Sequence, residues 1–269
     1  MLAAVLGKPV AHSLSPVIHN AGYAAAGLTG WSYTARECGE DELPALVDGL
    51  GPDWAGLSLT MPLKEVGLAV ADSASPLAVA LGAANTLVLR DGRRYADNTD
   101  APGMVTALAA AGRAAADRVA ILGAGGTARA ALAAARSLGA TEVIVYARRV
   151  AAVDELRAVA DRLGVPLAGR PWESAPAAVA ADVVISTVPR GVADPLATAP
   201  WHPATVLFDA LYDPWPTPLA AGASAAGCRV VSGLDLLLAQ AVGQFEQFTG
   251  VPAPVDAMRA ALDAARRSS

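Results

Sequence analysis

The chain has 269 residues, of which 54% are hydrophobic and 17% are charged. This composition is too apolar for a disordered protein, and the length suffices for one large core or two ordinary ones. Acidic residues outnumber basic ones by 25 to 20, and the resulting net charge of -5 argues against a nucleic acid partner. No segment approaches the ~18 uninterrupted apolar residues of a membrane-spanning helix, so we expect a cytoplasmic protein without a membrane partner.

Cysteine and lysine are both rare. Cys38 and Cys228 are the only cysteines and belong to no CxxC pair, so we predict neither a disulfide framework nor a metal site. Lys8 and Lys64 are the only lysines among 20 basic residues. An ammonium group is compact and can titrate, whereas a guanidinium group does not, so these two positions are candidates for a functional lysine.

Short apolar runs alternate with helical stretches along most of the chain, which is typical of an α/β protein with mostly parallel sheets. Asp91-Gly92 separates two of the runs and predicts a hairpin, because both central residues of a type I′ turn need a positive φ. The predicted strands cover residues 2–6, 31–37, 55–59, 86–89, 94–97, 118–122, 141–146, 183–186, 206–209 and 229–231.

The segment after the first strand, GKPVAHSLSPVIHN (residues 7–20), places two hydroxyl groups beside the start of a helix. Ser15 is expected to cap this helix, since Pro16 suits the first helical position. Capping does not explain Ser13, and loops at the carboxyl ends of strands commonly face a cleft. The two serines therefore suggest a carboxylate site, with a purely structural turn as the alternative.

The segment SLTMPLK (residues 58–64) has the same layout, with Thr60 as the expected cap of a helix that begins near Pro62. Lys64 then falls in the first helical turn, where the helix dipole disfavours a cation. The alternative is an ordinary exposed lysine. Asp100 precedes a helix expected at Pro102 and could act only as its cap. Gln240, taken alone, would be assigned to the surface.

A glycine-rich turn, GAGGTA (residues 123–128), lies between the strand at 118–122 and a helix at 128–138. A GxGxxA turn in this context allows the backbone to approach a pyrophosphate, which the helix N-terminus stabilises. A glycine-rich turn without a ligand is the alternative. The next strand, residues 141–146, is followed by Ala147-Arg148-Arg149 where an NAD enzyme would present the acidic residue that binds the ribose. Two guanidinium groups would attract a 2′-phosphate, so we predict NADP, with a solvated arginine pair as the alternative.

The βα rhythm restarts at Arg118, which indicates two domains. Two helices are predicted near the end, from apolar spacing over residues 234–248 and over 258–267. They exceed the needs of a doubly wound domain, so we assign them to the first domain. We thus expect an N-terminal α/β substrate domain with a mostly parallel sheet (residues 1–101 plus 235–269) and a Rossmann-type, doubly wound dinucleotide-binding domain (residues 102–234).

The segments GKPVAHSLSPVIHN, SLTMPLK, GAANT, NTD, GAGGTAR and GLDLLLAQ occur in this order and together resemble the shikimate dehydrogenase family. The resemblance spans the whole chain. It implies an oxidoreductase that reduces 3-dehydroshikimate to shikimate with NADPH in aromatic amino-acid biosynthesis, as a monomer or homodimer. Quinate or aminoshikimate dehydrogenation on the same scaffold is an alternative, and a non-catalytic NADP-binding regulator is a second one.

The resemblance also implies roles for single residues. Lys64 and Asp100 match the family's catalytic pair, and which of them donates the proton stays open. The implied substrate-binding residues are Ser13, Ser15, Thr60, Asn85, Tyr212 and Gln240. The implied cofactor-binding residues are Gly123, Ala124, Gly125, Gly126, Thr127, Ala128, Arg148, Arg149, Val188 and Gly233.

Four positions depart from the family pattern. Ser58 stands where asparagine is common, Ala147 replaces an asparagine beside the cofactor arginine, and Val188 replaces a threonine. Asp235-Leu236 replaces a Gly-Met pair expected near the nicotinamide. These departures affect the expected cofactor geometry more than the expected reaction.

Overall fold

The computed structural model describes residues 1–268 and divides the chain into two compact units. Unit 1 comprises Met1–Thr99 and the chain from Leu237 onward, and unit 2 comprises Asp100–Leu236. The chain passes from unit 1 to unit 2 after Thr99 and returns to unit 1 after Leu236, and each of these boundaries lies two residues from the one expected from the sequence. None of the helices in the described part of the chain has the length and apolarity needed to cross a membrane.

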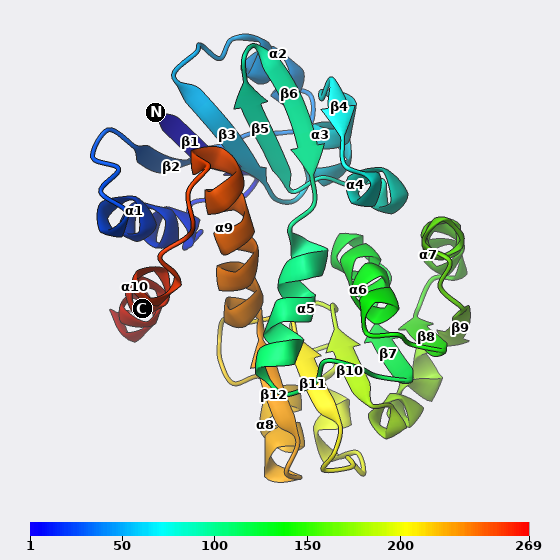
Figure 1. Ribbon diagram of the computed structural model, residues 1–269. Coiled ribbons are helices and arrows are strands. Elements are labelled where there is room, and N and C mark those ends of the chain that lie inside the picture. The colour runs from blue at the N-terminus through cyan, green and yellow to red at the C-terminus, as the bar shows by residue number, and fades with distance from the viewer. Residues whose placement is uncertain (269) are drawn as a thin grey trace. The chain divides into compact units, whose positions relative to one another are not determined.

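Unit 1 is built on a six-stranded sheet with the order β2-β1-β3-β5-β6-β4 (Figure 1). Strand β1 pairs in parallel with β2 and β3, whereas β5 runs antiparallel to β3 and β6. The predicted hairpin is confirmed, since Asp91 and Gly92 connect β5 to β6 with φ values of 54° and 72°. The strands are β1 (Leu2–Gly7), β2 (Ser32–Glu37), β3 (Trp54–Leu59), β4 (Ser73–Ala74), β5 (Thr86–Arg90) and β6 (Arg93–Asp97).

The helices of unit 1 cover a core to which Leu6, Leu57 and Leu87 contribute from the three neighbouring strands β1, β3 and β5. Helix α10 packs against α1 (Figure 1). Helix α9 begins in unit 2 and continues from Leu237 into unit 1, where Phe248 packs onto β3. The helices are α1 (Ser15–Ala25), α2 (Leu43–Asp48), α3 (Lys64–Ala69), α4 (Pro76–Leu81), α9 (Gly233–Thr249) and α10 (Val255–Ser268).

Unit 2 contains a fully parallel sheet with the order β12-β11-β10-β7-β8-β9. The first strand, β7, lies in the middle, and the order reverses between β7 and β10. This is the doubly wound arrangement, in which ligands bind beyond the carboxyl ends of the strands at the point of reversal. The strands are β7 (Arg118–Leu122), β8 (Glu142–Ala147), β9 (Leu167–Pro171), β10 (Val183–Ser186), β11 (Val206–Asp209) and β12 (Arg229–Ser232).

Helices α5, α6 and α7 of unit 2 pack in sequence against one another, and η1 and α8 contribute to a second core on the sheet. In that core Leu122, Val184 and Leu207 from β7, β10 and β11 contact apolar residues of η1 and α8. The helices are α5 (Asp100–Ala110), α6 (Gly126–Ser137), α7 (Val150–Leu163), α8 (Pro218–Ala225) and the 3₁₀ helices η1 (Trp172–Ala180) and η2 (Asp194–Thr198).

Two strands, β4 and β9, were not predicted from the sequence. Strand β4 has only two residues, and β9 reads LAGRP, in which glycine and proline are both poor strand formers. Both lie at sheet edges, where half-exposed residues form no apolar run. Their pairing with β6 and β8 depends on the neighbouring strand rather than on their own composition.

Candidate functional site

The predicted substrate residues of unit 1 gather at one edge of its sheet. Strands β1 and β3 are parallel, so the loops that carry Ser13 and Thr60 leave the same edge. Strand β5 is antiparallel to β3 and begins there, and the N–H of Leu59 donates to the backbone O of Asn85 at 2.8 Å. The N–H of Lys8 donates to the O of Met61 at 3.0 Å and ties the first two loops together.

The start of α1 differs from the prediction for Ser15. The helix begins at Ser15 itself, Leu14 occupies the N-cap position, and no side chain caps the helix. Ser13 instead accepts a hydrogen bond from the N–H of Ser15, with 3.3 Å between N and Oγ. A turn over residues 11–12 brings the hydroxyl of Ser13 close to the start of the helix. The prediction that Ser15 caps the helix was therefore wrong. Ser15 itself is buried.

The start of α3 also differs, since Thr60 does not cap the helix. Residues 61–63 form a turn in which the N–H of Leu63 donates to the backbone O of Thr60 at 2.8 Å. The helix then begins at Lys64, two residues after Pro62, with Leu63 as N-cap. The prediction that Lys64 occupies the first helical turn is confirmed. Lys64 is half-buried, and its backbone O accepts from the N–H of Ala84 at 2.8 Å.

Asn85 and Gln240 are neighbours in a buried polar cluster. Oδ1 of Asn85 accepts from the N–H of Thr99 and the hydroxyl of Thr86, both at 2.8 Å. Its Nδ2 donates to Oγ1 of Thr99 at 3.0 Å and, over a longer 3.5 Å, to Oε1 of Gln240. Gln240 is only 7% exposed, so its assignment to the surface was wrong. Asn85 directly precedes β5, and α9 packs Gln240 against it.

Asp100 is the first residue of α5 and of unit 2, two residues before the expected helix start. It is 9% exposed. It directly follows Thr99, whose N–H and hydroxyl belong to the polar cluster around Asn85.

In unit 2 the glycine-rich turn has the geometry expected of a dinucleotide loop. Gly123 has a φ of +100°, and a Cβ there would lie 2.7 Å from Oγ1 of Thr187. Gly125 and Gly126 face open space, so their backbone is accessible to a ligand. Helix α6 begins at Gly126, two residues before the expected position, and Ala128 is fully buried in it. Thr127 lies in its first turn.

A cavity of about 310 Å³ lies at the reversal point of the unit 2 sheet. Its walls come from the loops that follow four strands, β7 to β10, which is where a doubly wound sheet binds ligands. The predicted cofactor residues that line it are Gly123, Ala124, Gly125, Arg148, Arg149 and Val188, and the remaining lining residues are Ala147, Ala152, Trp172, Thr187, Pro189 and Val192.

Trp172 is a lining residue that the sequence did not identify. Pro171 pairs with Ala147, so Trp172 leaves β9 beside the two arginines that follow β8. Its place at the end of a strand could have identified it, but β9 lacks the apolar pattern by which a strand is predicted.

Tyr212 and Gly233 come together beyond β11 and β12. A Cβ on Gly233 would lie 2.1 Å from the backbone O of Ala210 and 3.0 Å from Cδ1 of Tyr212, so only glycine fits there. The loop is held by Asp209, whose carboxylate accepts from the hydroxyl of Thr217 at 2.7 Å. Burial raises the pKa of Asp209 and also that of Tyr212.

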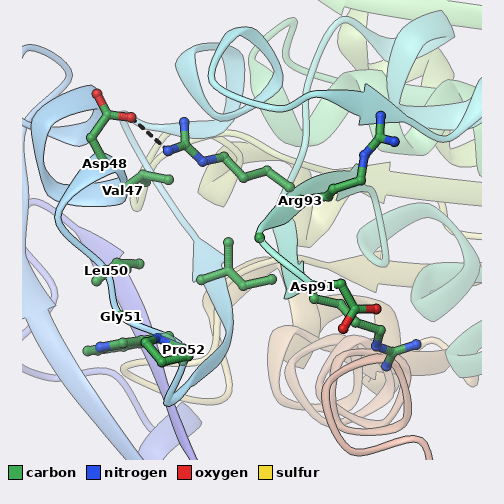
Figure 2. Close-up of a pocket in the computed structure, with 12 residues that line it drawn as sticks. Val47, Asp48, Leu50, Gly51, Pro52, Asp91 and Arg93 are labelled. Carbon is green, nitrogen blue, oxygen red and sulfur yellow. Dashed lines mark hydrogen bonds and ion pairs between the residues drawn. The ribbon is translucent and has the colours of Figure 1, made fainter.

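Unit 1 contains a larger cavity, of about 470 Å³, between α2 and the β5–β6 hairpin (Figure 2). Trp54 lines it at the start of β3, so it lies at the opposite sheet end from Asn85 and Thr60. The guanidinium of Arg94 is bound to Asp48 at 2.7 Å. None of the predicted site residues lines this cavity.

Comparisons with known proteins agree with this arrangement. A family model described as the shikimate dehydrogenase substrate binding domain matches residues 5–87, and the shikimate 5'-dehydrogenase C-terminal domain matches residues 233–262. A shikimate dehydrogenase (NADP(+)) from Caulobacter vibrioides is 42% identical over 265 residues, which cover 94% of this chain and 92% of that protein.

Solved structures extend the similarity to the whole chain. Mycobacterium tuberculosis shikimate dehydrogenase superposes with a TM-score of 0.90 at 47% identity, over 98% of this chain and 99% of that one. The Thermus thermophilus enzyme, solved with NADP(H) and shikimate, gives 0.86 at 33% identity over 98% and 99%. A quinate dehydrogenase from Corynebacterium glutamicum, solved with NAD, gives 0.89 at 26% identity over the same shares.

Proposed function

The chain belongs to the shikimate dehydrogenase family, and we propose that it catalyses the reversible, NADPH-dependent reduction of 3-dehydroshikimate to shikimate. The observation that carries this proposal is the gathering of Ser13, Thr60 and Asn85 at one edge of the unit 1 sheet. A polyhydroxylated ring with a carboxylate needs such a set of hydroxyl and amide groups.

For the substrate side, we propose that Ser13 and Ser15 bind the carboxylate together with Tyr212. Thr60, Asn85 and Gln240 bind ring hydroxyls. Buried amides and hydroxyls suit this task, because a ring that lacks a hydroxyl leaves their hydrogen bonds unsatisfied. Lys64 is a half-buried residue at the start of α3, and its ammonium group stabilises the alkoxide that forms at the carbonyl oxygen. Asp100 accepts a hydrogen bond from a ring hydroxyl and orients the ammonium.

The residues of unit 2 fit NADP. The open backbone at Gly125 and Gly126 faces the place of a pyrophosphate at the start of α6, and Arg148 and Arg149 line the same cavity. Thr127, Ala128, Val188 and Gly233 complete the proposed cofactor residues. When bound, NADPH supplies the hydride that reduces the carbonyl carbon.

The test is a nicotinamide absorbance assay with shikimate, quinate and an aminoshikimate. We expect the highest kcat/KM for shikimate with NADP. A higher value for quinate would favour the function of the Corynebacterium glutamicum relative. Binding of NADP without turnover of any of the three acids would favour a non-catalytic regulator.

Lys64→Ala is expected to lower kcat by about 10²–10⁴-fold, because general acid catalysis contributes on that order, while the affinity for NADP stays nearly unchanged. Lys8→Ala is the matched control, since Lys8 is the other lysine and is exposed. Retained turnover in Lys64→Ala would exclude the proposed role.

We also infer a cytoplasmic location and a monomeric or homodimeric state with a small-molecule substrate as the partner. Cys38 and Cys228 support this location, because both are free, buried thiols. Light scattering of the purified protein would establish the oligomeric state.

A further inference from the structure

A buried chain of hydrogen bonds runs through unit 1 from β2 to Asn85. The hydroxyl of Tyr33 donates to Oγ of Ser58, and Ser58 donates to Oε1 of Gln244, both over 2.6 Å. Gln244 then donates through Nε2 to the backbone O of Asn85 at 3.0 Å and to Oγ1 of Thr86 at 3.2 Å. Thr86 donates to Oδ1 of Asn85 at 2.8 Å.

We propose that Gln244 is a positioning residue that fixes the side-chain amide of Asn85 so that it presents an N–H, and not its carbonyl oxygen, towards Gln240 and the substrate. The proposal rests on the proposed function, because Asn85 and Gln240 are taken as substrate-binding residues. We call the chain Tyr33–Ser58–Gln244–Thr86 the relay.

The direction of the hydrogen bonds in the relay is fixed where it meets the backbone of Asn85. The backbone O of Asn85 can only accept, so the atom of Gln244 that faces it must be the amide nitrogen. The amide oxygen of Gln244 therefore accepts from Ser58, whose single proton is used there. Thr86 accepts from Gln244 and has its single proton left to donate to Oδ1 of Asn85. Beside the relay, the N–H of Thr99 can only donate, so it faces the same Oδ1.

This direction decides what Asn85 offers to a ligand. Its Oδ1 accepts from the N–H of Thr99 and from Thr86, whereas Nδ2 donates to Oγ1 of Thr99 at 3.0 Å and, over 3.5 Å, towards Oε1 of Gln240. The group of the substrate that meets Asn85 must then accept a hydrogen bond, as a ring hydroxyl oxygen does. If the amide rotated by 180°, the carbonyl oxygen would face that group and the N–H groups would face the N–H of Thr99.

The relay is closed off from water, so each of its groups depends on the next. The exposed fractions are 2% for Tyr33, 4% for Ser58, 1% for Gln244 and 0% for Thr86. His19 covers it by stacking on Tyr33, with ring centroids 4.1 Å apart and nearly parallel planes. Without water to replace a lost partner, removing one group changes the hydrogen bonds of the others.

Ser58 ties the relay to this particular chain, because it is one of the positions that depart from the family pattern. Its short hydroxyl bridges Tyr33 and Gln244, which lie on an edge strand and on α9. The competing explanation is that the relay only holds α9 against the sheet. That role predicts a lower melting temperature with unchanged substrate affinity, whereas positioning predicts a selective effect on shikimate.

The test compares Gln244→Met with Gln247→Met in steady-state oxidation of shikimate by NADP. Gln247 is one turn away on α9 and binds the carboxylate of Asp97 at 2.7 Å, outside the relay. We expect Gln244→Met to raise the KM for shikimate about tenfold and to leave the KM for NADP within twofold, because a buried polar group that loses its hydrogen-bond partner costs about a factor of ten. Gln247→Met should leave both KM values within twofold.

Ser58→Ala and Ser58→Thr give a second, milder pair that bears on the proposal even where Gln244→Met fails to fold. Ser58→Ala should raise the KM for shikimate about threefold by releasing the amide oxygen of Gln244, and Ser58→Thr should restore it by keeping the hydroxyl. Equal KM values for shikimate in Ser58→Ala and wild type would overturn the proposal. An equal rise of the KM for shikimate and the KM for NADP in Gln244→Met would overturn it as well. A wild-type chain that does not oxidise shikimate would instead refute the proposed function.

Discussion

The ring of Phe248 in α9 lies directly on the backbone of Gly56 in β3, so close that a Cβ at Gly56 would be 2.2 Å from Cε1 of the ring. The same Cβ would lie 2.9 Å from the backbone O of Leu87 in the neighbouring strand. This contact sets how closely α9 approaches the sheet, and α9 carries both Gln240 and Gln244. The positions of the proposed substrate amide of Gln240 and of the positioning residue Gln244 therefore depend on a glycine in the middle of a strand.

We predict that Gly56→Ala destabilises unit 1, because the added methyl group has no space between the ring and the strand. The free energy of unfolding, measured in urea, should fall by about 2–3 kcal/mol, the usual cost of overpacking. Gly51→Ala is the control, since a Cβ at that exposed position meets no atom within 4 Å. Adding Phe248→Leu to Gly56→Ala should cost less than the sum of the two single changes. Full additivity would contradict the contact.

The sequence predicted local features well where one rule decided the geometry. The Asp91-Gly92 hairpin and the strand-turn-helix around Gly123 follow from backbone freedom alone, and the structure has both. The comparisons confirm the predicted family and fold class. The proposed activity and cofactor agree with the names of these relatives, among them a shikimate dehydrogenase (NADP(+)) and an enzyme solved with NADP(H) and shikimate. The individual site roles and the domain boundaries stay predictions.

The errors occurred where two local rules competed or where contacts were distant in sequence. Ser15 precedes a proline and suits an N-cap, yet the helix begins at Ser15 itself, with Leu14 at the N-cap position, and the N–H of Ser15 donates to Oγ of Ser13. Gln240 is buried only because α9 packs against β5, which no local pattern shows. The link between Ser58 and Gln244 joins positions 186 residues apart. Periodicity and motifs carry no information on such a pair, so the relay emerged only from the structure.

The cofactor preference should depend on Arg148 and Arg149, which line the cavity of unit 2. We expect the double variant Arg148→Ala with Arg149→Ala to lower the ratio of kcat/KM for NADP over NAD by about 100-fold, because hydrogen bonds to a charged group contribute ~1.5–3 kcal/mol each. The kcat at saturating NADP should change little. Arg136→Ala, an exposed change in the last turn of α6, is the control. An unchanged ratio in the double variant would refute the 2′-phosphate assignment.

Stability should depend on the pH through His19, whose ring is fully buried against Tyr33. Burial lowers the pKa of His19 from 6.5 to about 3. Below pH 6.5 the unfolded chain binds a proton at His19 that the folded chain does not bind. The contribution of the neutral ring to the free energy of unfolding is therefore complete above pH 6.5 and is lost as the pH falls towards 3. Between pH 7.5 and pH 5 this loss amounts to about 2 kcal/mol.

The variant His19→Phe keeps the ring stack and removes the titration. Urea unfolding at pH 7.5 and pH 5 should therefore show a fall in stability that is about 2 kcal/mol smaller in this variant than in wild type. His12→Gln, at an exposed position, should retain the wild-type fall. Identical falls in wild type and His19→Phe would show that another group causes the acid sensitivity.

Trp172 should report on the bound cofactor, because it lines the same cavity as Arg148 and Arg149 at the end of β9. Stacking of a base on an aromatic ring contributes ~1–3 kcal/mol, so Trp172→Ala is expected to weaken NADPH binding by about tenfold, whereas Trp172→Phe keeps an aromatic ring and should change it by about threefold or less. Tryptophan fluorescence should fall on addition of NADPH through energy transfer to the nicotinamide, and most of that change should disappear in Trp172→Phe. Trp201→Phe is the control, since Trp201 is buried in the core of the same unit. If NADPH lowers the fluorescence of Trp172→Phe as much as that of wild type, and if Trp172→Ala binds NADPH with unchanged affinity, the adenosine end of the cofactor lies elsewhere.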